Sequence, residues 1–254
     1  MSIKRIVIYI SIIVSVLSVV SCKEDFPTLE DFAEYSKYLE NGDLEGVKKY
    51  YKKFGPRSVE QYGVEGLFMI NPLEVSLYYN HYDVAEFLLK KGANVNIIVP
   101  SINNYLFAAM IVNEKKDALR LLLKYGLDVN AKSINGETVL WYAARSGDID
   151  ILNWIVNKVK DINQLNDDKE NALTGAVYSG NMDCVQLLME KGININNIDN
   201  NGDTALFYSV YLKYIEISEY LIEHGADINI VDNEGYDAKW FADELGLQIK
   251  GLTY

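Results

Sequence analysis

The chain has 254 residues, of which 36 are acidic and 24 are basic, so its formal net charge is −12. Its composition, 49% hydrophobic and 24% charged, is typical of a globular protein and excludes a wholly disordered or collagen-like chain. The acidic balance argues against nucleic-acid binding, because a phosphate-binding protein needs a concentrated basic surface. Two cysteines cannot staple a small disulfide-rich fold.

The first residues are predicted to form an export signal. Lys4 and Arg5 precede an uncharged run over residues 6–20, which is shorter than the roughly 20 residues that a membrane-spanning helix needs. The run ends in the sequence VVSC at residues 19–22. This ending resembles the bacterial lipobox, in which an aliphatic and a small residue precede a cysteine that becomes lipidated. We therefore predict a lipoprotein signal peptide over residues 1–21; an uncleaved helical anchor is the alternative.

The lipobox resemblance implies acylation of Cys22, with chains such as palmitate, and a tether over residues 22–28. Several acyl chains on one cysteine are enough for stable membrane anchoring without a spanning helix. The expected location is a bacterial membrane, with the folded part facing the periplasm or the cell exterior. A lipidated Cys22 has no thiol, so we expect Cys184 to form no intramolecular disulfide.

Beyond residue 66 the sequence repeats with a period of 33 or 34 residues. Each unit is led by an apolar pair that ends in a leucine, at Leu73, Leu106, Leu140, Leu173 and Leu206. Each unit closes with a short turn motif, at residues 92–96, 126–130, 160–163, 192–196 and 225–229. This period and these motifs resemble ankyrin repeats. The resemblance implies an all-α solenoid of stacked helix pairs with short hairpin loops, in which stacking buries apolar faces that no unit can bury alone.

The resemblance divides the chain into repeats and atypical ends. Thr28 with Asp31 predicts a helix start, and residues 29–65 are expected to form an N-terminal capping helix pair followed by an irregular loop. Five ankyrin repeats are expected over residues 66–231. Residues 232–254 begin like a further repeat but lack a full second helix, so we expect a C-terminal capping repeat.

Two departures from the family pattern carry structural expectations. The family histidine after the lead leucine is replaced in every unit, so we expect packed aromatic side chains to contribute more to stability. Val159 stands where the other units close with glycine. We expect that turn to be slightly strained or differently shaped.

The sequence offers little catalytic chemistry. His81 and His224 are explained by repeat geometry, and Cys184 falls at an apolar helix position. Residues 199–203 resemble a calcium loop superficially, but they lack the later bidentate glutamate and coincide with a hairpin tip. We therefore predict no enzyme activity, catalytic residue, metal site, cofactor or small-molecule substrate. A tightly bound metal or cofactor would instead indicate an enzyme or a metal-dependent stress protein.

The family resemblance implies that the concave face, formed by hairpin tips and first helices, binds a protein partner. Positions five and six after each lead leucine are expected to point there, and they supply the candidate residues Tyr78, Tyr79, Ile111, Val112, Arg145, Tyr178, Tyr211 and Leu212. Tyrosine rings are rigid and amphipathic, which is typical of binding hot spots. Because the whole chain contains 19 tyrosines, composition alone is an alternative explanation.

Negative charge is concentrated in the C-terminal part. Residues 22–160 contain 19 acidic and 17 basic side chains, whereas residues 161–254 contain 17 and 5. Several of the acidic residues are expected at hairpin tips, namely Asp167, Asp168, Glu170, Asp199, Asp203, Asp232, Glu234 and Asp237. This surface either keeps the protein solvated or attracts a basic partner. Three functions remain open: protein recognition in the bacterial envelope through the concave face, neutralisation of a basic toxin or effector by an immunity or inhibitor protein, and a passive envelope component.

Overall fold

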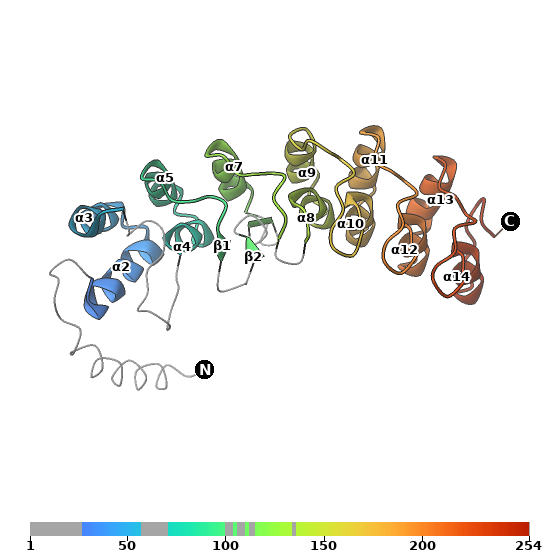
Figure 1. Ribbon diagram of the computed structural model, residues 1–254, viewed down its shortest axis with the longest axis horizontal. Coiled ribbons are helices and arrows are strands. Elements are labelled where there is room, and N and C mark those ends of the chain that lie inside the picture. Colours follow the sequence, from blue (N-terminus) through green and yellow to red (C-terminus); the bar gives the residue numbers. More distant parts are fainter. Residues whose placement is uncertain are drawn as a thin grey trace, which may run out of the picture.

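The computed structural model describes residues 27–56, 71–99, 104–105, 110–111, 115–133 and 136–253. Within them, short helices pair and stack side by side in a single curved row (Figure 1). The predicted signal peptide, Cys22 and nearly all of the expected irregular loop lie outside the described residues. Among the helices that are described, none combines the length and the apolar character needed to cross a membrane.

The row begins with α2 (Leu29–Asn41) and α3 (Leu44–Phe54). The helix start predicted at Thr28 is confirmed. Its hydroxyl accepts a hydrogen bond from the backbone N–H of Asp31 at 3.1 Å, and the Asp31 carboxylate accepts one from the Thr28 N–H at 2.8 Å. This reciprocal capping box satisfies two backbone donors that the helix itself leaves free. Tyr35 of α2 stacks on Tyr50 of α3 with ring centroids 3.9 Å apart, which joins the pair.

The helices that follow belong to two layers (Figure 1). The inner layer continues from α2 through α4 (Pro72–Tyr78), α8 (Val139–Arg145), α10 (Ala172–Ser179), α12 (Ala205–Tyr211) and α14 (Ala238–Glu244). The outer layer continues from α3 through α5 (Tyr82–Lys90), α7 (Lys116–Lys124), α9 (Ile149–Val156), α11 (Met182–Glu190) and α13 (Ile215–Glu223). The row bends so that the first layer lies on its concave side.

Strand pairing in the described residues is confined to hairpins. Strand β1 (Ile98–Val99) pairs antiparallel with β2 (Asn104–Tyr105), with Ile98 opposite Tyr105 and Val99 opposite Asn104. Single bridges join Lys132 to Thr138 and Val231 to Asp237. The predicted all-α solenoid is therefore confirmed, with short hairpins between its helix pairs.

The inner helices start at polar caps and turn their leucines into the core. Asn71, Thr138, Asn171, Thr204 and Asp237 precede these helices, and each side chain accepts a hydrogen bond from a backbone N–H of the first turn. The lead leucines that the structure describes are buried between neighbouring units, at Leu73, Leu140, Leu173 and Leu206. The sequence pattern thus fixes both the start of each inner helix and the face that it buries.

The closing motifs contain an asparagine ladder that links successive units. The first Asn or Asp of a motif closes its own turn: the Asp128 carboxylate accepts a hydrogen bond from the Asn130 N–H at 2.9 Å. The second Asn reaches the next unit, and the Asn130 side-chain oxygen accepts from the Lys160 N–H at 3.0 Å. The same link joins Asn96 to Asp128, Asn163 to Asn194, and Asn196 to Asp227. Two asparagine-type positions per motif are needed because one acts within the unit and the other between units.

Both departures from the family pattern have visible consequences. Phe207, at a family histidine position, packs its ring against Phe241 at 4.3 Å, as expected. Helix α9 has eight residues, whereas α11 and α13 have nine. After α9, the N–H groups of Lys158 and Val159 both donate to the Ile155 carbonyl, and neither residue has a positive φ. The turn at Val159 is therefore differently shaped, without left-handed backbone strain.

Candidate functional site

Three predicted tyrosines are exposed at the ends of inner helices. Tyr78 is the last residue of α4, Tyr79 follows it, and Tyr211 is the last residue of α12. Their exposed fractions are 54%, 49% and 58%, respectively. Tyr78 and Tyr79 contact each other edge to face at 5.3 Å, and the Lys115 ammonium lies 5.7 Å from the Tyr78 ring centroid. These rings are available to a partner on the inner layer.

The prediction for Ile111 is wrong. Its side chain is fully buried and belongs to the hydrophobic core that runs through the stack. An isoleucine at this position gains more from packing against the core than from facing solvent. Val112, predicted beside it, lies outside the described residues.

The other predicted residues line one groove on the inner face. Arg145 on α8, Tyr178 on α10 and Leu212 directly after α12 border an open depression of about 700 Å³. The remaining lining residues are Glu137, Trp141, Tyr142, Asp168 and Glu170. Tyr78, Tyr79 and Tyr211 are outside this lining, so the structure divides the predicted site into a groove and two exposed tyrosine positions.

Close packing of two inner helices positions this groove. Helices α8 and α10 pack against each other at Gly175. A Cβ atom on Gly175 would lie 2.9 Å from the Trp141 carbonyl oxygen, so only glycine allows this approach. Trp141 and Tyr178 are thereby brought to the same depression from neighbouring units.

Glu170 lies buried at the floor of the groove, with 6% of its surface exposed. Its Oε2 accepts hydrogen bonds from the Trp141 Nε1–H at 3.0 Å and the Asn166 Nδ2–H at 2.9 Å, and its Oε1 accepts from the Tyr178 hydroxyl at 2.7 Å. Burial, together with this hydrogen bond to Glu170, raises the pKa of Tyr178. Trp141 occupies the family histidine position and, as expected of an aromatic replacement, ties two units together.

Arg145 covers the aromatic wall of the groove. Its guanidinium carbon lies 5.2 Å from the Trp141 ring centroid and 5.0 Å from the Tyr178 ring centroid. Both distances are within the range of cation–π attraction. Within the described residues Arg145 forms no ion pair. The guanidinium is therefore held by the rings of Trp141 and Tyr178, and its N–H groups remain available to a partner.

The next hairpin also contains a buried carboxylate, that of Asp199. The Asp199 Oδ2 accepts a hydrogen bond from the Tyr208 hydroxyl at 2.6 Å, and its Oδ1 accepts from the N–H groups of Asn201 and Asp203 at 2.7 and 2.9 Å. Asp203 Oδ1 is buried and has no hydrogen-bond partner among the residues that the structure describes. Burial and the neighbouring Asp199 and Asp232 raise the pKa of Asp203 to about 6.

Several hairpin acids predicted from the charge pattern therefore have internal roles. Glu170 and Asp199 are buried, Asp232 closes its own hairpin, and Asp237 caps α14. Asp167, Asp168 and Glu234 remain exposed. The acidic surface open to a partner is smaller than the sequence alone indicated.

Sequence reasoning missed Trp141, Tyr142, Glu137, Asp168 and Glu170 as parts of one groove. Their positions relative to the lead leucine were visible, since Trp141 directly follows Leu140. What the sequence did not show is that side chains from neighbouring units meet in one depression. The close contact of α8 with α10 at Gly175 brings them together.

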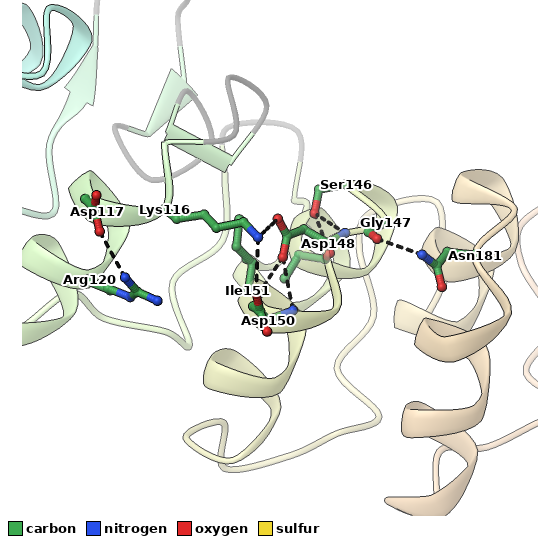
Figure 2. Close-up of polar contacts among 10 residues, drawn as sticks. Lys116, Asp117, Arg120, Ser146, Gly147, Asp148, Asp150, Ile151 and Asn181 are labelled. Carbon is green, nitrogen blue, oxygen red and sulfur yellow. Dashed lines mark hydrogen bonds and ion pairs between the residues drawn. The ribbon is translucent and has the colours of Figure 1, made fainter.

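A polar cluster on the outer layer is structural (Figure 2). The Asp148 carboxylate caps α9 by accepting from the N–H groups of Asp150 and Ile151, and it pairs with the Lys116 ammonium of α7 at 2.7 Å. Burial alone would raise the pKa of Asp148, but these bonds lower it overall. Asn181, before α11, donates to the Gly147 carbonyl at 2.9 Å. Successive outer helices are linked in this way.

The residues considered for catalysis are held by the repeat architecture. The His81 Nε2 is 2.8 Å from the Glu40 carbonyl oxygen, and the His224 Nδ1 is 2.7 Å from the Tyr220 carbonyl oxygen. Cys184 is fully buried, and burial raises the pKa of its thiol to about 11. Across the part of the chain that the structure describes, no three His, Cys, Asp or Glu residues are grouped to hold a metal ion.

Comparison with known proteins agrees with the architecture. Family models of ankyrin repeats match residues 70–98, 105–156 and 149–232, which together make up more than half of the chain. An ankyrin repeat protein of Acanthamoeba polyphaga mimivirus is 27% identical over 85 residues, or 34% of this chain. That match spans only 11% of the viral protein. The repeat models, the stacked helix pairs and the linked closing motifs all show that this chain belongs to the ankyrin-repeat family.

Proposed function

We propose that this chain is a lipid-anchored ankyrin-repeat protein of the bacterial envelope that binds a protein partner through its inner face. Ankyrin repeats are protein-interaction modules and generally serve as non-enzymatic scaffolds. The observation that carries the proposal is the exposure of Tyr78, Tyr79 and Tyr211 on the same layer of helices that borders the groove. Large exposed aromatic side chains gathered on one face of a protein are typical of interaction sites.

The proposed anchor rests on the sequence around Cys22. In this proposal residues 1–21 are removed, Cys22 is acylated, and a short tether connects it to the capping pair and five repeats. Metabolic labelling with an alkyne-bearing palmitate, followed by membrane fractionation, tests it. We expect the unaltered chain to be labelled and membrane-bound, and Cys22→Ser to be unlabelled and to keep residues 1–21, which mass measurement of the intact chain detects. Equal labelling of Cys22→Ser and the unaltered chain would contradict the lipid anchor.

Affinity purification tests partner binding. The detergent-solubilised full chain is compared with a variant carrying Tyr78→Ala, Tyr79→Ala and Tyr211→Ala, and retained proteins are identified by mass spectrometry. We expect one stoichiometric partner to be retained by the first and lost from the second, because the rings supply the contact area. Ile215→Ala, which truncates an exposed apolar side chain at the start of outer helix α13, is the control. Equal retention by all three proteins would contradict an inner-face site.

A second candidate function is an immunity or inhibitor role against a basic toxin or effector. The excess of acidic side chains over residues 161–254 favours it, because opposite charge accelerates association. Identification of a basic, toxic protein in the same purification would support this function over a general envelope role. A purification that retains no partner would instead favour a passive envelope component.

A further inference from the structure

We propose that the groove between α8, α10 and α12 binds the cationic side chain of an arginine or lysine in a partner protein. This inference rests on the proposed function, since it specifies the chemistry of the partner at the inner face. Its occupant is a segment of a protein in which the cationic residue has an aliphatic neighbour.

The first argument is the buried carboxyl group at the floor. Glu170 receives three hydrogen bonds, all from neutral donors, and within the described residues it forms no ion pair. Charge interactions strengthen where water is excluded, and a buried carboxylate without a cation is costly. A cation entering the groove would gain most beside Glu170.

The second argument is the charge of the lining. Among the described residues that line the groove, Glu137, Asp168 and Glu170 are acidic and Arg145 alone is basic. Asp168 is exposed on the rim and forms no ion pair in the described part of the chain. The lining is therefore complementary to positive charge and would repel an acidic segment.

The third argument is that the aromatic wall already holds a guanidinium. Arg145 lies about equally far from the Trp141 and Tyr178 rings, at 5.2 and 5.0 Å. Arg145 is itself exposed and makes no ion pair with any residue that the structure describes, so a partner cation can compete for these ring faces. Planar guanidinium groups stack on aromatic rings better than ammonium groups do, which favours arginine.

The fourth argument gives the neighbouring contact. Leu212 is half-buried, lines the groove and directly follows α12, which lies on the other side of α10 from α8 (Figure 1). A depression of about 700 Å³ falls within the size range of binding pockets. A side chain next to the cation that contacts Leu212 would be aliphatic.

Fluorescence anisotropy with two dye-labelled pentapeptides tests the inference. One has the sequence Gly-Leu-Arg-Leu-Gly, and the other replaces arginine by citrulline, which has nearly the same shape but no charge. With the purified full chain at physiological salt, we expect the arginine peptide to bind about tenfold more tightly. Asp168→Asn should weaken that binding about threefold, because it removes one exposed rim charge. Glu170→Gln, with folding checked by circular dichroism, should abolish the preference for arginine.

Glu234→Gln is the matched control, because it removes an exposed hairpin acid that does not line the groove. It should leave arginine binding within about twofold of the unaltered chain. Equal binding of both peptides, no binding of either, or equal weakening by Glu234→Gln and Asp168→Asn would overturn the inference. If these results occur while a partner is still captured through the exposed tyrosines, the cation site is wrong and the proposed function stands.

Discussion

At the residue scale, Lys169 departs from the rest of its structural series. It has φ of +61° at a hairpin tip where the corresponding residues Gly136, Gly202 and Gly235 also have positive φ. A side chain with a Cβ atom is strained in this left-handed conformation, whereas glycine is not. Lys169→Gly should therefore raise the free energy of unfolding by about 0.5 kcal/mol, because relief of strain outweighs the added freedom of the unfolded chain. Urea denaturation followed by circular dichroism measures this change.

Lys158→Gly is the matched control for Lys169→Gly. Lys158 is also an exposed lysine in a turn, at the end of the preceding unit, but its φ is not positive. Glycine there only adds freedom to the unfolded chain, so stability should fall or stay unchanged. A loss of stability in both variants would show that the tip at Lys169 is not strained.

Asp203 predicts an unusual pH dependence. Its pKa is raised from 3.8 to about 6 by burial, and further by Asp199 and Asp232. The folded protein therefore holds a proton on this group between about pH 4 and pH 6, where the unfolded chain has released it. Stability due to Asp203 should rise as the pH falls from 7 to 5, by about 1 kcal/mol because partial exposure screens the effect. Thermal unfolding across this range measures the change.

Asp203→Asn removes this titration while keeping a side chain of similar shape. The variant should be more stable than the unaltered chain at pH 7, and the difference should shrink at pH 5. Paired carboxylates behave differently. The pKa of Glu86 is lowered to about 2 by hydrogen bonds from Lys124, Tyr125 and Lys90, so its contribution to stability is lost only when the pH falls below about 4. Parallel stability curves for the two proteins between pH 5 and pH 7 would contradict the assignment.

At the element scale, the asparagine ladder predicts how neighbouring units are coupled. The Asn163 side-chain oxygen accepts from the Asn194 N–H at 2.7 Å across a unit boundary. Asn163→Ala removes that acceptor and should lower the free energy of unfolding by about 1 kcal/mol. Hydrogen exchange should show the loss at the boundary, because each unit of a solenoid is stabilised by its neighbours. We expect faster exchange of the amide of Asn194 in particular.

Asn229→Ala separates coupling between units from closure within a unit. The Asn229 backbone N–H and side chain both donate to the Asp227 carboxylate inside the same motif. Its truncation removes only the side-chain donor of that local pair, so a smaller loss without a change at any unit boundary is expected. If the two variants lose equal stability, the link between Asn163 and Asn194 contributes little.

The sequence predicted features that depend on neighbouring residues in the chain, and it failed for features that depend on packing between units. Helix starts such as Thr28 and closing turns were predictable, because they follow from capping chemistry within a few residues. The surface position of Ile111 was predicted wrongly from an average repeat, because burial is decided by the surrounding packing. Glu170 was identified as a hairpin acid, but its burial depends on Trp141 and Tyr178 from two neighbouring units.

At the scale of the whole molecule, the folded protein is more acidic at the surface of its C-terminal part, but less so than the sequence alone indicates. The sequence gives 17 acidic and 5 basic residues after residue 160, and folding buries Glu170 and Asp199 among them. Asp167, Asp168 and Glu234 remain exposed on the hairpins of the inner face. These exposed charges can raise the rate of encounter with a basic partner without setting the lifetime of the complex.

This asymmetry predicts salt-dependent association with a basic probe. Stopped-flow mixing with a dye-labelled hexa-arginine peptide should show an association rate about tenfold lower in concentrated than in dilute salt, because ions screen exposed charges. Removing the three tip charges with Asp167→Asn, Asp168→Asn and Glu234→Gln should lower the rate in dilute salt and flatten its dependence. A variant with the same change in net charge at the other end of the row is the control, with Glu30→Gln, Glu40→Gln and Asp83→Asn. Since exposed charges act over about a Debye length, the control should keep a rate close to that of the unaltered chain. A salt-independent rate, or equal effects of both triple variants, would show that the acidic hairpins only solvate the protein.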